Sequence, residues 1–209
     1  MSLLLLIRHG ENDYVKKKRL AGRLPGVHLN ETGQKQAKAV AQSLAPRLKK
    51  ASVKAVYSSP LERTMETAEP IAKALNVDIV ARPGLIETDY GDWQGKTLKD
   101  LGRRKLWKVV QNNPSLMRFP GGESFAETQT RMCNEIETLR NEHSEKDVII
   151  CVSHSDPIKL VVGYYLGLPL DFFQRLMIAP ASITTMLIGD SGSRLLNLNT
   201  DISLTLMNH

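Results

Sequence analysis

The sequence predicts an α/β fold with a mostly parallel sheet, because short apolar runs alternate along the chain with segments of helical periodicity. Helix-start signals follow the apolar runs closely, as crossover connections between parallel strands require. Three of the runs end in polar residues, where open α/β sheets gather their ligands. At 209 residues, the chain has room for one domain with a small lobe inserted in it.

In the first half of the chain, residues 3–7, 53–57 and 77–80 are expected to be strands. A helix is expected from Gln34 to about Leu44, where small apolar residues recur at helical spacing. Ser59, Pro60 and Glu62 combine an N-cap residue, a first-turn proline and a capping-box glutamate, which predicts a second helix start.

In the second half, the periodicity fails over residues 91–122, which are rich in glycine, proline and basic residues and are expected to form a helical cap over the edge of the sheet. Ser124 and Glu127 form a capping box ahead of a helix. Residues 148–152 are the most β-prone run, followed by a helix that Asp156 caps and that stops at Gly167. Residues 184–188 and 195–198 predict a terminal hairpin.

Composition narrows the classes of function. Hydrophobic residues make up 42% and charged residues 24%, which is typical of a globular domain, and no apolar run is long enough to cross a membrane. No basic leader precedes the first strand, so a cytoplasmic protein is expected. The net charge of +6 favours anionic ligands, but aromatics are only 5%, so nucleic-acid binding is not expected. The pattern does not predict an oligomeric state.

The cysteines and histidines predict neither a disulfide nor a metal site. Cys133 falls in a helical pattern and Cys151 in a strand, so both are expected to be buried free thiols. The five histidines show no paired metal-ligand spacing. We therefore expect neither a metal nor an organic cofactor.

The end of the first strand points to phosphate chemistry. Five apolar residues are followed at once by Arg8, His9 and Gly10. An arginine offers a fork of donors that fits phosphate oxygens, and a histidine can attack phosphorus or move protons near neutral pH.

Two other strands end in a comparable way. The second leads into a helix whose first turn carries Arg63, and the strand over 148–152 delivers His154 just before a helix. If these strands are parallel, their carboxyl ends share one edge, and helix N-termini there also favour an anion. Arg8, His9, Arg63 and His154 are therefore expected to converge.

The sequence resembles the histidine phosphatase superfamily, also called the phosphoglycerate mutase-like family. The resemblance extends over nearly the whole chain, with the motifs in the expected order. They are Arg8-His9-Gly10, residues 22–29 with Gly33, residues 57–63, residues 87–95, residues 120–124 and residues 152–154. The resemblance implies a three-layer αβα sandwich with an inserted cap.

It also implies a mechanism. His9 would attack phosphorus and form a phosphohistidine, with its other ring N–H donated to a backbone carbonyl. Arg8, Arg63 and His154 would hold the phosphoryl oxygens. Glu87 would protonate the leaving alcohol and then activate water, which needs a raised pKa and therefore an apolar wall beside it; Asp89 is the rival candidate.

The motifs depart from the family pattern at two positions. The family often has Asn where this chain has Val15, and Asn12 is the candidate replacement; many members have Gly where this chain has Ser155. Asn12, Gly22, Arg23 and Ser155 are the expected substrate-binding residues.

The leading functional hypothesis is a metal-independent phosphatase that hydrolyses small phosphorylated metabolites. The first alternative is a phosphomutase of the phosphoglycerate type, which uses the same histidine and depends on a bisphosphate primer. A lesser alternative is a non-catalytic binder of phosphorylated ligands, which the presence of His9, Glu87 and His154 disfavours.

Overall fold

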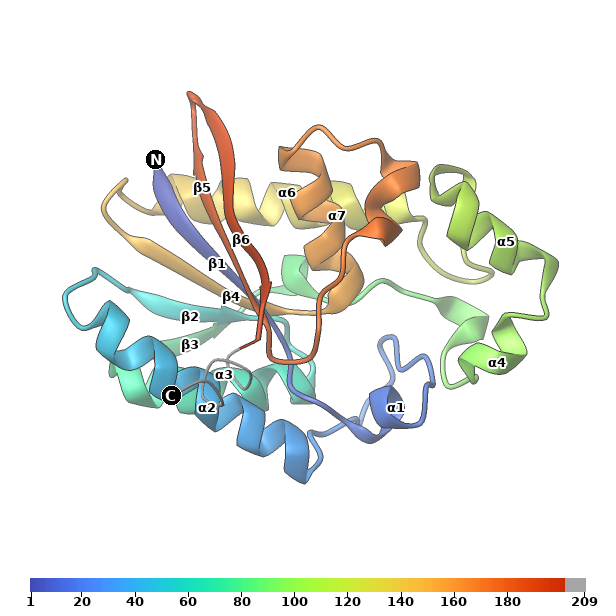
Figure 1. The fold of residues 1–209 in the computed structure, drawn as a ribbon, viewed down its shortest axis with the longest axis horizontal. Helices are drawn as coiled ribbons and strands as arrows, with labels where there is room; N and C mark the ends of the chain where they lie inside the picture. Colours follow the sequence, from blue (N-terminus) through green and yellow to red (C-terminus); the bar gives the residue numbers. More distant parts are fainter. Residues whose placement is uncertain (202–209) are drawn as a thin grey trace.

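The computed structural model describes residues 1–201, which form a six-stranded sheet in the order β3-β2-β4-β1-β5-β6 (Figure 1). Four strands are parallel: β1 (Ser2–Arg8), β2 (Ala55–Ser58), β3 (Asp78–Ala81) and β4 (Val148–Ser153). β5 (Ile183–Gly189) pairs antiparallel with β1 and forms the predicted hairpin with β6 (Gly192–Thr200). The prediction of a mostly parallel sheet is confirmed.

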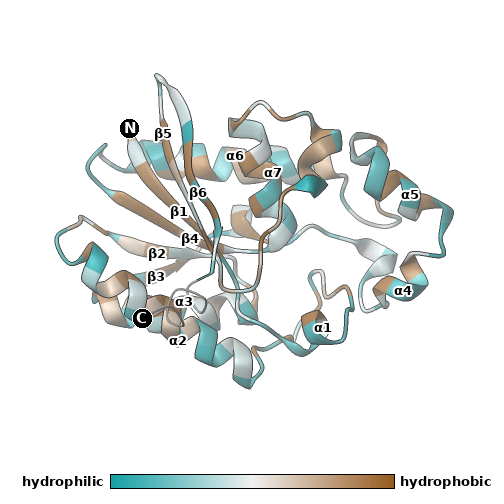
Figure 2. Cartoon of the chain, viewed as in Figure 1, coloured by the Kyte–Doolittle hydropathy of each residue, from teal (hydrophilic) through white to brown (hydrophobic). Residues whose placement is uncertain are grey.

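Long helices cover both faces of the sheet and make three layers (Figure 1). They are α2 (Glu31–Leu48) and α3 (Glu62–Leu75) on one face, and α6 (Phe125–Glu142) and α7 (Ser155–Tyr165) on the other. The leucine run of β1 serves both, because successive side chains of a strand point to opposite faces. Leu4 and Leu6 pack with α6 and α7, whereas Leu5 and Ile7 pack with α2 and α3. The central strands are accordingly brown in Figure 2.

The segment 91–122 folds into short helices beside the carboxyl ends of the strands (Figure 1). They are the 3-10 turns η2 (Gly91–Trp93) and η3 (Pro114–Leu116) and the helices α4 (Leu98–Leu101) and α5 (Lys105–Asn112). A third core cluster joins this segment to the sandwich through Trp93, Phe119, Phe125 and Phe173. Its assignment as a cap inserted in one domain remains a prediction.

Shorter elements complete the chain: α1 (Asp13–Lys16), η1 (Pro83–Leu85) and η4 (Leu170–Arg175). Cys133 and Cys151 are buried free thiols, as expected. Within residues 1–201, no helix is both long and apolar enough to cross a bilayer.

The predicted helix starts differ in accuracy. The Ser124–Glu127 capping box is present with both of its hydrogen bonds. α2 begins at Glu31, earlier than expected, because the side chain of Asn30 accepts a hydrogen bond from the Gly33 amide and caps the helix there.

Two capping assignments are wrong. α3 begins at Glu62 after Leu61, without a side-chain cap, so Ser59 is not the N-cap residue. α7 begins at Ser155 after His154, so Asp156 lies in the first turn and does not cap the helix. The Ser59 hydroxyl instead bonds to His154, and the Asp156 carboxylate accepts from Tyr90. Both side chains therefore bond to side chains distant in the sequence, and not to the backbone amides that local capping rules predict as their partners.

Candidate active site

The carboxyl ends of three parallel strands lie level with one another. In the sheet register Arg8 faces Ser153 and Ser58 faces Val152. The ladder continues by one residue, since the His9 amide donates to the Ser153 carbonyl and the Ser59 amide to the Val152 carbonyl. This register brings the first residue after each strand, His9, Ser59 and His154, to one edge of the sheet.

A cavity of about 380 Å³ opens at this edge. Arg8, His9, Arg63 and Glu87 line it, and His154 lies fully buried beside them. The ring centroids of His9 and His154 are 5.3 Å apart, and Arg63 Nη2 lies 3.1 Å from His154 Nδ1. The two arginines and two histidines therefore converge as the sequence predicted.

His9 is held with one ring nitrogen free. Its Nδ1 lies 2.7 Å from the Gly10 carbonyl oxygen, which can only accept, so Nδ1 carries the proton and Nε2 does not. Burial, together with the charges of Arg63 and Arg8, holds the pKa of His9 well below its ordinary value. The imidazole is therefore neutral near pH 7, with a lone pair on Nε2.

The guanidinium groups of Arg8 and Arg63 line the same cavity as His9, and only some of their donors have partners. Arg8 Nη1 donates to the Ile178 carbonyl at 2.6 Å, and Arg63 Nη2 donates to the Gly22 carbonyl at 2.8 Å. Arg8 Nε, Arg63 Nε and Arg63 Nη1 are buried without hydrogen-bond partners. Unsatisfied buried donors are costly, so their grouping around one cavity is typical of an oxyanion site.

His154 is fixed by hydrogen bonds on both ring nitrogens. Because a guanidinium can only donate, Nδ1 accepts from Arg63, and Nε2–H donates to the Ser59 hydroxyl at 2.8 Å. Burial and the neighbouring Arg63 hold the pKa of His154 well below its ordinary value. The His154 imidazole is therefore neutral and held in one orientation beside His9.

Glu87 follows η1 and is nearly buried, with Oε2 3.8 Å from His154 Nδ1. Burial, followed by the nearby charge of Asp156, raises the pKa of Glu87 to about 7, against the opposing charge of Arg63. Asp89, the rival candidate, does not line the cavity; its Oδ1 accepts from the Gly91 amide. Of the two carboxyl groups, the geometry favours Glu87 as the one that can exchange a proton in the cavity.

The comparisons with known proteins agree with this geometry. The family model of the histidine phosphatase superfamily (branch 1) matches residues 4–201. The chain belongs to this superfamily.

Its relatives include both phosphatases and mutases. Phosphoserine phosphatase 1 from Hydrogenobacter thermophilus is 31% identical over 201 residues, covering 95% of this chain and 92% of the relative. A 2,3-bisphosphoglycerate-dependent phosphoglycerate mutase from Thermoplasma acidophilum is 30% identical over 190 residues, covering 89% and 87%. The solved mycobacterial glucosyl-3-phosphoglycerate phosphatase Rv2419c, in complex with VO3, has a TM-score of 0.85 at 27% identity, covering 96% of this chain and all of that one.

In this member of the superfamily, Tyr90 and Asp156 are cavity residues that sequence reasoning did not single out. Both line the cavity, and the Tyr90 hydroxyl donates to Asp156 Oδ2 at 2.8 Å and lies 3.5 Å from Glu87 Oε1. The available signal was the position of Asp156, two residues after His154 at a helix start. An Asp at a helix start favours a capping role, so this position alone does not indicate a contact with Tyr90.

The expected substrate-binding residues separate into two groups. Asn12, Gly22 and Ser155 line the cavity. Asn12 Oδ1 accepts from the Val15 amide, which leaves its buried Nδ2 without a partner and available to an anion.

Arg23 does not line the cavity, and its assignment to substrate binding stays a prediction. Its Nη2 pairs with Glu123 Oε1 at 2.6 Å, and its Nε donates to the Glu87 carbonyl at 2.8 Å. Arg131 donates to the same carbonyl at 3.4 Å and pairs with Glu123 Oε2 at 3.1 Å. The two arginines thus fix the backbone of Glu87 through its carbonyl oxygen.

Among residues 1–201, no group of three or more His, Cys, Asp and Glu side chains is arranged to hold a metal ion.

Proposed function

We propose that this chain is a phosphatase that hydrolyses small phosphomonoesters through a phosphohistidine at His9, without a metal. The observation that carries the proposal is the grouping of unpartnered donors of Arg8, Arg63 and Asn12 around the cavity where His9 presents an unprotonated Nε2. Its relatives and structural neighbours, which include a phosphoserine phosphatase and a glucosyl-3-phosphoglycerate phosphatase, support the same reaction type.

In the first step, His9 Nε2 attacks phosphorus while the bond to the leaving oxygen breaks. Arg8, Arg63 and Asn12 donate to the equatorial oxygens, where charge is spread in the transition state. Glu87, protonated because its pKa is raised, gives its proton to the leaving alcohol. His154 is a positioning residue in this scheme, because both of its ring nitrogens are engaged by Arg63 and Ser59.

In the second step, the ionised Glu87 removes a proton from water as the water oxygen attacks phosphorus. The P–N bond to His9 breaks, and inorganic phosphate leaves. A pKa near neutrality allows the same carboxyl group to serve first as acid and then as base.

The phosphomutase remains the second candidate, since the Thermoplasma acidophilum relative is a bisphosphoglycerate-dependent mutase. Both reactions pass through the same phosphohistidine, and they differ in whether water or a phosphoglycerate hydroxyl accepts the phosphoryl group. A mutase is expected to isomerise phosphoglycerate and to need a bisphosphate primer.

The test is phosphate release from a panel of phosphomonoesters between about pH 5 and pH 8 with a chelator present. Acid-labile labelled protein is expected after rapid quenching with a radiolabelled substrate. Both signals are expected to be lost in His9→Ala while the circular dichroism spectrum is unchanged. The matched control is His28→Ala, which removes an exposed histidine that pairs with Glu66. Activity retained in His9→Ala would refute the nucleophile assignment, and primer-dependent isomerisation without release of phosphate would favour the mutase.

A further inference from the structure

The segment 91–122 has two chemically different sides. It contains nine charged residues, of which seven are lysines or arginines. None of these nine lines the cavity. The six residues of the segment that do line it are apolar or carry a neutral amide: Trp93, Leu98, Trp107, Val110, Gln111 and Phe119.

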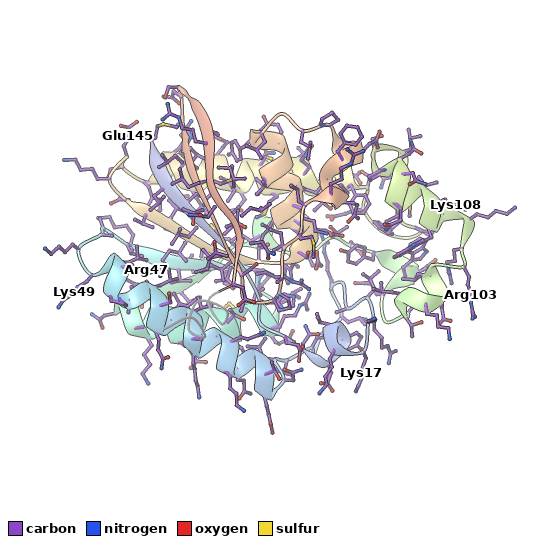
Figure 3. All side chains as sticks on the ribbon, in the orientation of Figure 1. Lys17, Arg47, Lys49, Arg103, Lys108 and Glu145 are labelled. Atoms are coloured by element: carbon purple, nitrogen blue, oxygen red, sulfur yellow. The ribbon has the colours of Figure 1, made fainter. Side chains whose placement is uncertain are left out.

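Eight of these nine charged residues are exposed, and Lys96 is half-buried. Figure 3 shows Arg103 and Lys108 extending from the outer side of α4 and α5, away from the sheet. Lys108 directly follows Trp107, so neighbouring residues of one helix divide between solvent and cavity. An amphipathic helix whose apolar side faces a cavity and not only a packed core presents a binding wall there.

Another part of the cavity is lined by charged residues at the carboxyl ends of the strands. Arg8, Arg63 and His9 form the phosphoryl cradle, and the carboxyl groups of Glu87 and Asp156 lie on the same side. An additional carboxylate on the leaving group would be unfavourable beside those acidic groups or against the apolar side chains of the segment, and it would be favourable only beside Lys18 and Arg19, which also line the cavity. An apolar leaving group would bury its surface against the indole and aliphatic side chains.

We propose that this wall is the leaving-group site and that it selects phosphomonoesters of apolar alcohols, alkyl or aryl, over those with a charged leaving group. This inference rests on the proposed phosphatase function and adds the substrate class. Trp107, Leu98 and Val110 are its specificity-determining residues. Gln111 carries the side-chain amide of the segment that lines the cavity, and it can accept a hydrogen bond from, or donate one to, a hydroxyl or amide on the substrate.

Two exposed cations of the cavity support a competing interpretation, in which the leaving group carries a second anionic group. Lys18 and Arg19 also line the cavity. The Arg19 guanidinium donates twice to the Gly95 carbonyl, at 2.9 and 2.6 Å, so its donors are partly used. Lys18 is exposed and is the cation best placed to bind a second anion of a substrate.

The experiment measures kcat/KM for ethyl, butyl and hexyl phosphate and for phosphoserine, whose net charge is the same as that of an alkyl phosphate. Each buried methylene is expected to raise kcat/KM about threefold, and hexyl phosphate is expected to exceed phosphoserine by at least about tenfold. Trp107→Ala is expected to remove most of this chain-length dependence, so that kcat/KM falls far more for hexyl phosphate than for ethyl phosphate. Lys108→Ala, the neighbouring residue on the outer side, is the control and is expected to change neither.

Leu98→Ala, at a partly exposed position, repeats the test where Trp107→Ala fails to fold. Lys18→Ala is expected to lower kcat/KM for hexyl phosphate and phosphoserine by the same factor. A flat response to chain length, or a loss confined to phosphoserine in Lys18→Ala, would overturn the apolar leaving-group site. Either result would leave phosphate release itself intact, whereas absence of release from every ester would count against the phosphatase proposal instead.

Discussion

At His9, a single hydrogen bond decides which nitrogen can react. The Gly10 carbonyl accepts from Nδ1–H, and this orients Nε2 with its lone pair free. Gly10 also passes very close to the neighbouring chain, since a Cβ there would lie 2.6 Å from the Gly33 carbonyl oxygen. The Gly10 amide donates to the Thr67 hydroxyl, which in turn donates to the Arg63 carbonyl. His9 and Arg63 are thus positioned through one shared chain of contacts.

Asp156 is predicted to set the pH at which Glu87 works. The negative charge of Asp156 raises the pKa of Glu87, so Asp156→Asn should lower that pKa. The first step needs protonated Glu87, and its rate should then fall at a lower pH than in the wild type. The measurement is the pH profile of the phosphorylation burst with an alkyl phosphate. Lys159→Met is the control, because it removes the ammonium that pairs with Asp156 while keeping the carboxylate. An unmoved alkaline limb in Asp156→Asn would show that Asp156 acts by structure alone.

Glu87→Gln is predicted to slow esters with poor leaving groups most. A glutamine cannot protonate the departing oxygen, and a nitrophenolate needs that proton far less than an alkoxide does. The measurement is the burst rate for 4-nitrophenyl phosphate and for butyl phosphate in the wild type and in the variant. Equal slowing of the two substrates would argue that Glu87 does not act as the acid.

At the scale of single elements, sequence-based prediction succeeded where the apolar or capping pattern lies within one strand or helix. The run in β1 predicted a strand buried on both faces, and the Ser124–Glu127 pair predicted the start of α6. The prediction failed at Ser59 and Asp156, whose side chains serve His154 and Tyr90 from other elements. Capping rules describe local hydrogen bonds, and they cannot anticipate a partner that the fold brings from about ninety residues away.

The capping box of α6 should contribute measurably to stability. Ser124 Oγ accepts from the Glu127 amide, and Glu127 accepts from the Ser124 amide. Ser124→Ala is expected to lower the free energy of unfolding by about 1 kcal/mol, because an N-cap acceptor is lost. The measurement is urea unfolding with the m-value held in common. The control is Thr138→Ala, which removes a hydroxyl that donates within the same helix to the Asn134 carbonyl and caps nothing. Equal losses for the two variants would argue against a specific capping contribution.

At the scale of the whole molecule, the parallel order of β2, β4 and β1 is what makes one site from distant motifs. The sequence could predict that Arg8, Arg63 and His154 meet, because each follows a strand and parallel strands end at one edge. It could not predict the Arg23–Glu123–Arg131 group, which holds Glu87 through its backbone carbonyl. Every residue has a backbone carbonyl, so the identity of residue 87 does not indicate that its carbonyl accepts hydrogen bonds from Arg23 and Arg131. Only the structure identifies such contacts.

The net charge of +6 predicts electrostatic steering of dianionic esters to the cavity. Lys18 lines the cavity, whereas Figure 3 shows Lys49 at the end of the molecule opposite α5. Because screening acts over about 10 Å at 0.1 M salt, Lys18→Gln should lower kcat/KM at low salt severalfold more than Lys49→Gln, although both variants lose one charge. The difference between the variants should shrink as salt is added, with kcat unchanged, since steering accelerates encounter and not the chemical step. The measurement is kcat/KM for butyl phosphate at several ionic strengths. Equal effects of the two substitutions would mean that net charge, and not the position of the cation at the mouth, governs capture of the ester.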